Sequence, residues 1–465
     1  MNKSSKVTIL WFRRDLRLYD NPALNWVCEN SEQVIPIYIH SEEEEQPWSA
    51  GAASKWYLHH SLQALELQLQ QYELELNYYC GDAYNIIKDL IAETGADSLA
   101  FNKLYDPHLY ERDKQLYLKL NKDVTISVFD AGLFFKPGSI LNNQEKPYRV
   151  FTPFYRKARK LLDTHDQAIY PQQLNKNKLT ALNCLNPGSG KALSTLNLLG
   201  EIHWYQKFEK YWQPGELSAS VLLEKYIHET LFNYEQARDI PSMDGTSRIS
   251  VALHFGELTV KQLLANLHPF LDGLGQAKDV AATELFLKQI LWREFAHHIL
   301  WHFPHTSTEP MNPRYKKSFW KQNEKHLLAW QRGETGEPIV DAGMKQLWET
   351  GWMHNRVRMI VSSYLTKNLG IHWMEGAKWF WDTLVDADLA NNSMGWQWVA
   401  GCGVDAAPYY RIFNPQTQAK RFDAEEKYID KWLPEKQTNE YPQAIVDLKE
   451  SREKALERYK TKISG

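Results

Sequence analysis

The stretch from Asp386 to Asn414 concentrates the residue types that bind a polar ligand. Acids, amides and tryptophans stand close together in it: Asp386, Asp388, Asn391, Asn392, Trp396 and Trp398. Buried acids and amides are costly unless each finds a partner, and the glycines of the segment let a backbone approach a bound group closely. The pattern predicts a polar site inside an aromatic wall. A capped helix followed by a glycine-rich turn would show the same residue pattern.

A second candidate is GTSRIS at residues 245–250, which offers a glycine turn, hydroxyl groups and an arginine. Hydroxyls and backbone N–H groups that open a helix suit a diphosphate. The alternative is an ordinary helix N-cap, for which Thr246 or Ser247 alone would be enough.

These two segments and three further motifs resemble the photolyase/cryptochrome family. The further motifs are WFRRDLRLYDNPAL (11–24), LWREF (291–295) and TGWMHNRVRM (350–359), and all five stand in the order typical of that family. Two more stretches, GAASKWYLHHSL (51–62) and FAHHILWHFP (295–304), are most similar to bacterial class III cyclobutane-dimer photolyases, which are close relatives of plant cryptochromes. The resemblance covers nearly the whole chain and implies FAD as the cofactor.

The resemblance also implies which residues bind FAD: Tyr234, Thr246, Ser247, Ile249, Ser250, Arg358, Asp386, Asp388 and Asn392. It pairs Arg358 with Asp386 near the flavin ring, although a purely structural ion pair would look the same in sequence. Asn392 takes the position that faces flavin N5, which is Asn in photolyases, commonly Asp in plant cryptochromes and Cys in animal ones. A neutral amide can hydrogen-bond N5 without giving it a proton, which favours repair over signalling.

Tryptophans match the family's chain that carries electrons from the surface to the flavin: Trp320, Trp373 and Trp396. With Asn392, they are the residues that we expect to serve the reaction. Each tryptophan alone would be interpreted as core, and the joint match favours electron transfer. Other tryptophans could form a branch but are interpreted as core: Trp348, Trp379 and Trp381.

The same match assigns substrate binding to five residues: Gln289, Trp292, Asn355, Met359 and Trp398. A fused pyrimidine pair stacks poorly, so flipping it out of the duplex costs only on the order of a few kcal/mol. Relatives that repair the (6-4) photoproduct carry histidines at the positions of Asn355 and Met359. The hypothesis of (6-4) repair therefore lacks its acid catalyst in this chain. Gln289 stands where many dimer photolyases have Glu, and (6-4) enzymes also carry Gln there, so the lesion stays open.

Two regions of different periodicity must position these residues. Between residues 6 and 130, short apolar runs alternate with helical patterns, which predicts a Rossmann-like parallel sheet covered by helices on both faces. The strands are expected at VTILWF, VIPIYI, LNYYC, LAFNKLY and TISVFD. The predicted parts are an α/β antenna-binding domain (1–131), a surface connector (132–215), an all-α FAD-binding and catalytic domain (216–432) and a charged C-terminal helix or tail (433–465).

The first strand is not followed by GxGxxG, so the dinucleotide fingerprint is absent. The resemblance implies that the α/β domain binds a light-harvesting antenna instead, with methenyltetrahydrofolate favoured. Glu111 lies where folate-type photolyases place the carboxylate that grips the pterin ring. The alternative for Glu111 is an exposed helix acid.

Composition limits the partners and the compartment. The formal net charge of −3 gives no support for nucleic-acid binding, so a contact with UV-damaged DNA must use a local basic face. Four scattered cysteines without CxxC predict a reducing cytoplasm and argue against zinc, iron–sulfur and disulfide frameworks, so no metal site is expected. No apolar run is long enough to cross a bilayer and no signal-peptide pattern is present, so we expect a soluble monomer.

The sequence therefore predicts a photolyase that repairs cyclobutane pyrimidine dimers with blue light, by electron transfer from excited, fully reduced FAD. The main alternative is a cryptochrome-type photoreceptor, against which Asn392 and the lack of a long C-terminal extension argue. A (6-4) photolyase is a further alternative. A non-photochemical FAD-dependent oxidoreductase would leave the three tryptophan matches unexplained.

Overall fold

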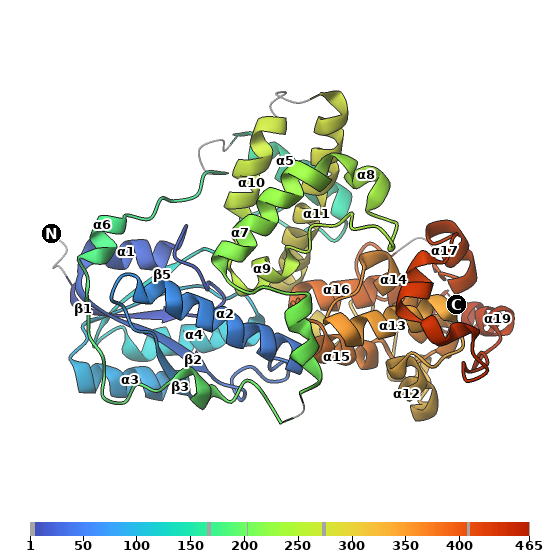
Figure 1. Cartoon of the computed structure of the whole chain (residues 1–465), viewed down its shortest axis with the longest axis horizontal. Helices are drawn as coiled ribbons and strands as arrows, with labels where there is room; N and C mark the ends of the chain where they lie inside the picture. Colours follow the sequence, from blue (N-terminus) through green and yellow to red (C-terminus); the bar gives the residue numbers. More distant parts are fainter. Residues whose placement is uncertain (1–4, 165–168, 202, 272–275, 407–409, 465) are drawn as a thin grey trace.

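The computed structural model describes residues 5–164, 169–201, 203–271, 276–406 and 410–464. Figure 1 shows an α/β unit, formed by the first part of the chain, beside a larger helical unit. None of the helices within these ranges is long and apolar enough to cross a membrane.

The α/β unit contains a parallel sheet with the strand order β3-β2-β1-β4-β5. The strands are β1 Ser5–Phe12, β2 Ser31–His40, β3 Asn77–Cys80, β4 Ser98–Asn102, β5 Thr125–Phe129 and β6 Asn183–Cys184. β1 to β5 lie where the apolar runs predict them, so the predicted parallel sheet is confirmed. β6 comes from the predicted connector and pairs with β2.

Helices cover both faces of this sheet: α1 Pro22–Asn30, α2 Ala52–Gln70, α3 Ala83–Thr94 and α4 Pro107–Leu120. Successive residues of a strand point to opposite faces. Leu10 and Phe12 pack with α1 and α2, whereas Ile9 and Trp11 pack with α3 and α4. Because both faces are buried, the strands are nearly continuous in apolar residues.

The segment between the two units is more than a surface loop. Helix α5 (Phe151–Thr164) contributes Phe154 to the core of the helical unit, and Phe208 of a short helix joins the core of the α/β unit. On α5, three basic residues are exposed: Arg156, Lys157 and Lys160. Arg159 instead forms an ion pair with Glu284 at 2.7 Å.

The helical unit contains the helices from residue 216 onward. Its helices are α7 Glu216–Lys225, α8 Tyr234–Ala237, α9 Ser250–Phe255, α10 Val260–Pro269, α11 Ala277–His302, α12 Glu324–Arg332, α13 Pro338–Thr350, α14 Asn355–Ser363, α15 Trp373–Thr383, α16 Leu389–Ala400, α17 Pro415–Phe422, α18 Lys427–Trp432 and α19 Leu448–Tyr459. α16 packs against α11, α14 and α15. It therefore lies where the core around α11 meets the core around α13 to α15 (Figure 1).

Candidate functional site

Helix α16 and its flanks have the local structure of a capped helix followed by a glycine turn. The Asp388 carboxylate oxygen Oδ1 accepts hydrogen bonds from the backbone N–H (2.9 Å) and the side-chain Nδ2 (2.6 Å) of Asn391. Gly401 ends the helix with φ of 86°, a conformation that favours glycine. This capping uses only one oxygen of Asp388, so the other oxygen is available for a further interaction.

Asp386, just before the helix, is buried in the ion pair predicted for it. Arg358 Nη2 donates to both oxygens of Asp386, at 3.0 and 3.1 Å, and Ser250 donates its hydroxyl at 2.8 Å. Arg358 Nε is held by the carbonyl of Met353 at 2.8 Å. Residues from α9, α14 and the start of α16, far apart in sequence, thus meet at one carboxylate.

Asp388 has two neighbours that sequence reasoning missed. His297 Nε2 and His254 Nδ1 lie 3.5 and 3.7 Å from its second oxygen, Oδ2. Burial alone would raise the pKa of the Asp388 carboxyl, but the two histidines together hold it well below its usual range. No sequence motif links these histidines to an aspartate a hundred residues away, so only the fold could reveal them.

The GTSRIS loop lies against the short helix α8. A Cβ on Gly245 would approach the Cβ of Ala237 to 2.4 Å, so only glycine allows this contact, which places the loop beside the helix of buried Tyr234. Ile249 is buried too, whereas Thr246 and Ser247 are half-buried.

Two arginines make this region suitable for the diphosphate of FAD. The guanidinium of Arg248 lies 4.9 Å from the ring centroid of Trp352, and Arg356 pairs with Asp239 at 2.8 Å. Within the described ranges, the Nε atoms of both arginines are buried without a hydrogen-bond partner. Unpaired buried donors beside hydroxyl groups fit an anionic ligand, because such donors are costly when nothing binds them.

Asn392 lies on the side of α16 that faces α15. Its Nδ2 donates to the carbonyl of Ala377 at 3.0 Å, which fixes the orientation of the amide and leaves Oδ1 as its acceptor. One turn later, the Trp396 ring packs directly on Gly376, where a Cβ would come within 2.0 Å of it. Asn392 and Trp396 therefore share the α15–α16 contact.

The three predicted electron carriers lie along the helical core. Trp373 and Trp396 are fully buried, and Trp320 is half-buried. The His372 ring lies between two of them, with its centroid 5.1 Å from that of Trp320 and 5.7 Å from that of Trp373. The ring order Trp320, His372, Trp373 thus runs from a partly exposed indole to a buried one.

The interpretation of the further tryptophans as core is correct for Trp381, which is buried and donates its Nε1 to Ser49 at 2.7 Å. It is wrong for Trp348, which is 40% exposed. Trp348 is stacked between Trp204 (4.4 Å between centroids) and Trp379 (6.1 Å). The partner Trp204 comes from the segment between the units, so sequence spacing could not reveal this stack.

The predicted substrate residues lie on three helices that pack together: Gln289 and Trp292 on α11, Asn355 and Met359 on α14, and Trp398 on α16. Trp292 is stacked face to face on Phe151, with centroids 3.6 Å apart. Trp398 stacks on Phe413 and has the Arg411 guanidinium 5.2 Å from its ring centroid. These contacts leave both indoles only partly buried.

The other three are arranged differently. Asn355 is exposed at the first turn of α14, and Met359 follows it one turn later, half-buried. Gln289 Nε2 donates to the carbonyl of Leu285 at 3.3 Å, within its own helix. A bond of that length holds the amide weakly, so the Gln289 side chain can turn toward a ligand.

Comparisons with known proteins follow the same division of the chain. A model described as DNA photolyase matches residues 8–172, and one described as the FAD binding domain of DNA photolyase matches residues 286–440. A deoxyribodipyrimidine photo-lyase of Agrobacterium fabrum is 39% identical over 99% of this chain and 98% of its own. The chain belongs to the photolyase/cryptochrome family.

Other relatives place it within this family. Cryptochrome-2 of Arabidopsis thaliana is 34% identical over 93% of this chain and 71% of its own length. The solved class III photolyase from Agrobacterium tumefaciens superposes with a TM-score of 0.91 at 38% identity, covering 100% of this chain and 99% of that one. The predicted similarity to class III photolyases is therefore confirmed.

The matched FAD-binding domain contains α11 from residue 286 onward and α12 to α16. It therefore includes the ion pair of Asp386, the three predicted electron-carrying tryptophans and all the predicted substrate residues. Tyr234 and the GTSRIS loop lie before the matched range. The structure nonetheless joins this loop to the domain, through the Ser250–Asp386 hydrogen bond.

A cavity lies between the two units of this photolyase-family chain. It opens beside the carboxyl ends of β1 and β2, where parallel sheets commonly bind ligands. Polar and charged groups line part of it: Arg13, Arg14, Glu45, Arg112 and His254. Glu111 is not among its lining residues, since that side chain is exposed on α4 and accepts a hydrogen bond from Gln115 at 2.7 Å.

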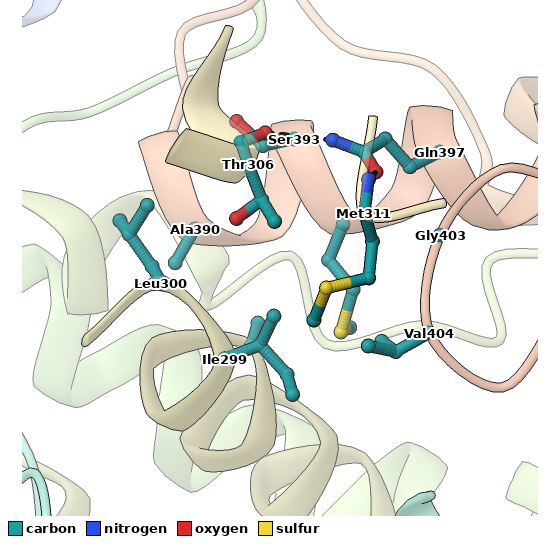
Figure 2. A pocket seen from close by; sticks show the side chains of 11 residues that line it. Ile299, Leu300, Thr306, Met311, Ala390, Ser393, Gln397, Gly403 and Val404 are labelled. Atoms are coloured by element: carbon teal, nitrogen blue, oxygen red, sulfur yellow. Dashed lines mark hydrogen bonds between the residues drawn. The ribbon is translucent and has the colours of Figure 1, made fainter. Parts of the chain in front are cut away.

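A second, smaller pocket lies on the α11 side of α16 (Figure 2). It is lined mainly by apolar groups, including Ile299, Leu300, Met311 and Val404. Its polar residue Gln397 is already engaged, since its amide accepts from the Met311 N–H at 2.9 Å. The pocket contains none of the predicted site residues, so the two sides of α16 differ in chemistry.

Proposed function

We propose that this protein repairs cyclobutane pyrimidine dimers in UV-damaged DNA with blue light. The proposal rests above all on full-length similarity to deoxyribodipyrimidine photo-lyases in a chain whose polar site on α16 has an amide, not a carboxylic acid, at Asn392. When bound and fully reduced, FAD supplies an excited electron to the dimer and takes it back once the cyclobutane ring has opened.

The chain's own residues bind and orient this cofactor. We propose that Thr246, Ser247 and Arg248 receive the diphosphate, with Tyr234, Ile249 and Ser250 shaping the surrounding wall. Asp386 and Asp388 provide carboxylate acceptors for N–H and O–H groups of FAD. The fixed amide of Asn392 offers Oδ1 as an acceptor and no acidic proton.

The tryptophans Trp320, Trp373 and Trp396 would deliver electrons from the surface to the cofactor. This role fits a path from a half-buried indole inward, with His372 packed between the first two rings. It predicts that Trp373→Phe abolishes most of the light-driven reduction of bound FAD, measured by absorbance in the presence of a thiol donor. A chemical reductant should restore repair.

Trp330→Phe is the matched control, because Trp330 is equally buried and contacts Trp396 but lies outside the proposed path. Equal loss in both variants would count against a defined path. Unchanged light-driven reduction in Trp373→Phe would contradict the role of Trp373.

For the substrate, we propose a slot between α11, α14 and α16, in which Trp292 and Trp398 stack on a flipped dimer. Gln289, Asn355 and Met359 would contact its edge. Arg411, near Trp398, is exposed and suits a phosphate contact. We expect the protein to act as a monomer in the cytoplasm.

A second, light-harvesting chromophore is also proposed, with methenyltetrahydrofolate favoured. An archaeal relative from Sulfolobus tokodaii, 26% identical with a TM-score of 0.83, was solved with two FAD molecules, with the implication of a novel light-harvesting cofactor. The cavity between the units is the site that we propose here, since it lies beside the carboxyl ends of β1 and β2, where parallel sheets commonly bind ligands. Glu111 stays a prediction, which Glu111→Gln would test through the chromophore content of the purified protein.

The deciding experiment measures repair of a defined thymine dimer by the purified, photoreduced protein under blue light, with a dark control. We expect light-dependent loss of the dimer, with Trp292→Ala and Asn355→Ala reducing binding of damaged DNA but not FAD content. Absence of repair with FAD bound and photoreducible would contradict the proposal. A (6-4) substrate would then test the other lesion, and failure on both would favour the photoreceptor.

A further inference from the structure

The Asp388 carboxylate divides its two oxygens between different tasks. Oδ1 caps α16 through Asn391, as described above. Oδ2 faces two imidazoles that come from separate helices, His254 of α9 and His297 of α11. Both ring nitrogens that face Oδ2 are buried and, in the part of the chain that the structure describes, lack a partner within hydrogen-bond geometry.

The carboxylate of Asp388 and the two imidazoles are all buried. Asp388 and His254 are each about 8% exposed, and the His297 side chain is 11% exposed. A carboxylate at such depth takes up a proton unless opposite charge or donors stabilise the ion. Arg358 is committed to Asp386. The two imidazoles therefore act on the Oδ2 side of Asp388, whereas Asn391 binds Oδ1.

Other charged groups face the imidazoles from the neighbouring elements. Arg14, in the loop after β1, and Asp106, before α4, form an ion pair beside His254. The buried Glu294, on the same helix as His297, is bound to the backbone N–H groups of Phe134 and Phe135, both at 3.1 Å. Arg14 is bound to Asp106, and its influence on Asp388 is electrostatic. Glu294 is an acid and cannot take the place of an imidazole at Asp388.

We propose that His254 and His297 are positioning residues that clamp Oδ2 of Asp388, so that this carboxylate stays charged and correctly aimed when FAD binds. We call these two residues the histidine clamp. The inference rests on the proposed function in one respect, namely that FAD occupies the site at the start of α16. It adds a requirement that the repair proposal does not contain, because the clamp acts on FAD retention without light or DNA.

The clamp has a consequence for pH dependence. In the native protein the pKa of Asp388 lies well below its usual range, so the carboxylate stays charged down to low pH. Burial lowers the pKa of His254, which therefore stays neutral near pH 7. Without the imidazoles, the effect of burial gains weight at Asp388 and raises its pKa, so that the carboxyl becomes protonated more readily as the pH falls.

The test measures release of FAD from the full holoprotein, followed by flavin fluorescence after dilution, at pH 8 and pH 6. The variants are the double His254→Gln/His297→Gln, Asp388→Asn and the triple combination. His302→Gln is the matched control, because His302 ends the same helix as His297 without facing Asp388. Asn still caps a helix, so Asp388→Asn changes charge more than local structure.

For the native protein and His302→Gln, we expect release rates that differ less than about twofold between the two pH values. For the double variant, we expect release about tenfold faster at pH 6 than at pH 8, since a protonated Asp388 forfeits a charge-assisted hydrogen bond to FAD. The triple variant should release FAD quickly at both pH values, because the titrating carboxyl is gone. A merely structural role of the histidines would not create a pH step that Asp388→Asn removes.

Two results would overturn the proposal: native-like release from the double variant at both pH values, or a pH step that persists in the triple variant. If the double variant does not fold, His297→Gln alone replaces it, and a step of the same sign but smaller size is expected. No step in that single variant would overturn the proposal as well. Failure of dimer repair with the pH step present would contradict the proposed function alone.

Discussion

Two pairs of carboxylates are buried to a comparable degree in this molecule but differ in the kind of residue that surrounds them. Glu216 and Glu257, which we call the junction pair, lie where the α/β unit meets the helical unit. Asp386 and Asp388, the α16 pair, lie at the proposed FAD site. The junction pair is bound by neutral donors, whereas the α16 pair is bound by an arginine and two histidines.

At the junction the donors come from both units. Glu257 accepts from the Tyr57 hydroxyl (2.8 Å), the Ser61 hydroxyl and the Gly215 N–H (2.6 Å). Glu216 accepts from the backbone N–H groups of Leu18 (2.8 Å) and Tyr19 (2.9 Å). Such a set joins the two units through hydrogen bonds from neutral donors.

The difference appears in the direction of the pKa shifts. Burial raises the pKa of Glu257 to about 7, although three hydrogen bonds oppose the shift. The pKa of Asp388 is instead held well below its usual range. Neutral donors at the junction therefore leave the effect of burial dominant, whereas the histidines beside Asp388 help to keep this carboxylate charged for a ligand.

The largest expected effect comes from Glu257→Leu at the junction. Three donors would lose their acceptor inside the protein, at about 1–3 kcal/mol each, so we expect the free energy of unfolding to fall by about 3–6 kcal/mol. Urea titration would measure this, and the fraction that stays folded should retain FAD. Glu224→Leu, on the exposed side of α7, should change the free energy by less than about 0.5 kcal/mol. Loss of FAD with an unchanged free energy of unfolding would contradict a purely structural role for the junction pair.

The next effect concerns pH. Because the pKa of Glu257 is higher in the folded protein than in the unfolded chain, the folded state binds an extra proton between about pH 4.5 and 7. Stability from this group is present below pH 4.5 and is lost as the pH rises through 7. Relative to Glu257→Gln, the native protein should lose on the order of 3 kcal/mol across this window. A native protein that loses stability relative to Glu257→Gln as the pH falls from 7 to 4.5 would contradict this prediction.

The division between the pairs explains which parts of the molecule the sequence could predict. Strand and helix periodicity is local, so the sheet and the helical unit follow from it. The Arg358–Asp386 pair could be predicted because both residues stand in motifs of a family with a shared fold. In contrast, Tyr57 and Glu257 are separated by 200 residues and belong to no common motif.

The partners that the sequence could not predict share one property: each joins elements that only tertiary packing brings together. His254 and His297 reach Asp388 from two helices, and Trp204 reaches Trp348 from the segment between the units. A lone histidine or tryptophan in a sequence is most often core. Depth and neighbours, rather than residue type, decide its role.

A smaller effect is expected from Asp386→Asn in the α16 pair. The substitution leaves the Arg358 guanidinium without its counter-charge, but this side chain is 24% exposed and water compensates part of the loss. We expect a decrease of about 1–2 kcal/mol in the free energy of unfolding and release of FAD about tenfold faster. Glu375→Gln, exposed at the start of α15, is the control and should change neither. A stability loss as large as that of Glu257→Leu would place Asp386 with the junction pair.

The smallest and sharpest test compares one neutral hydrogen bond in each pair. Gln68 Nε2 donates to Glu216 at 3.1 Å, and the Ser250 hydroxyl donates to Asp386 at 2.8 Å. Gln68→Ala and Ser250→Ala should each lower the free energy of unfolding by about 1 kcal/mol, since each removes one neutral donor from a carboxylate that keeps other partners. Only Ser250→Ala should accelerate FAD release, because its carboxylate faces the ligand whereas Glu216 faces backbone. Equal FAD release from the two variants would mean that partner chemistry, by itself, does not separate structural from ligand-binding carboxylates in this fold.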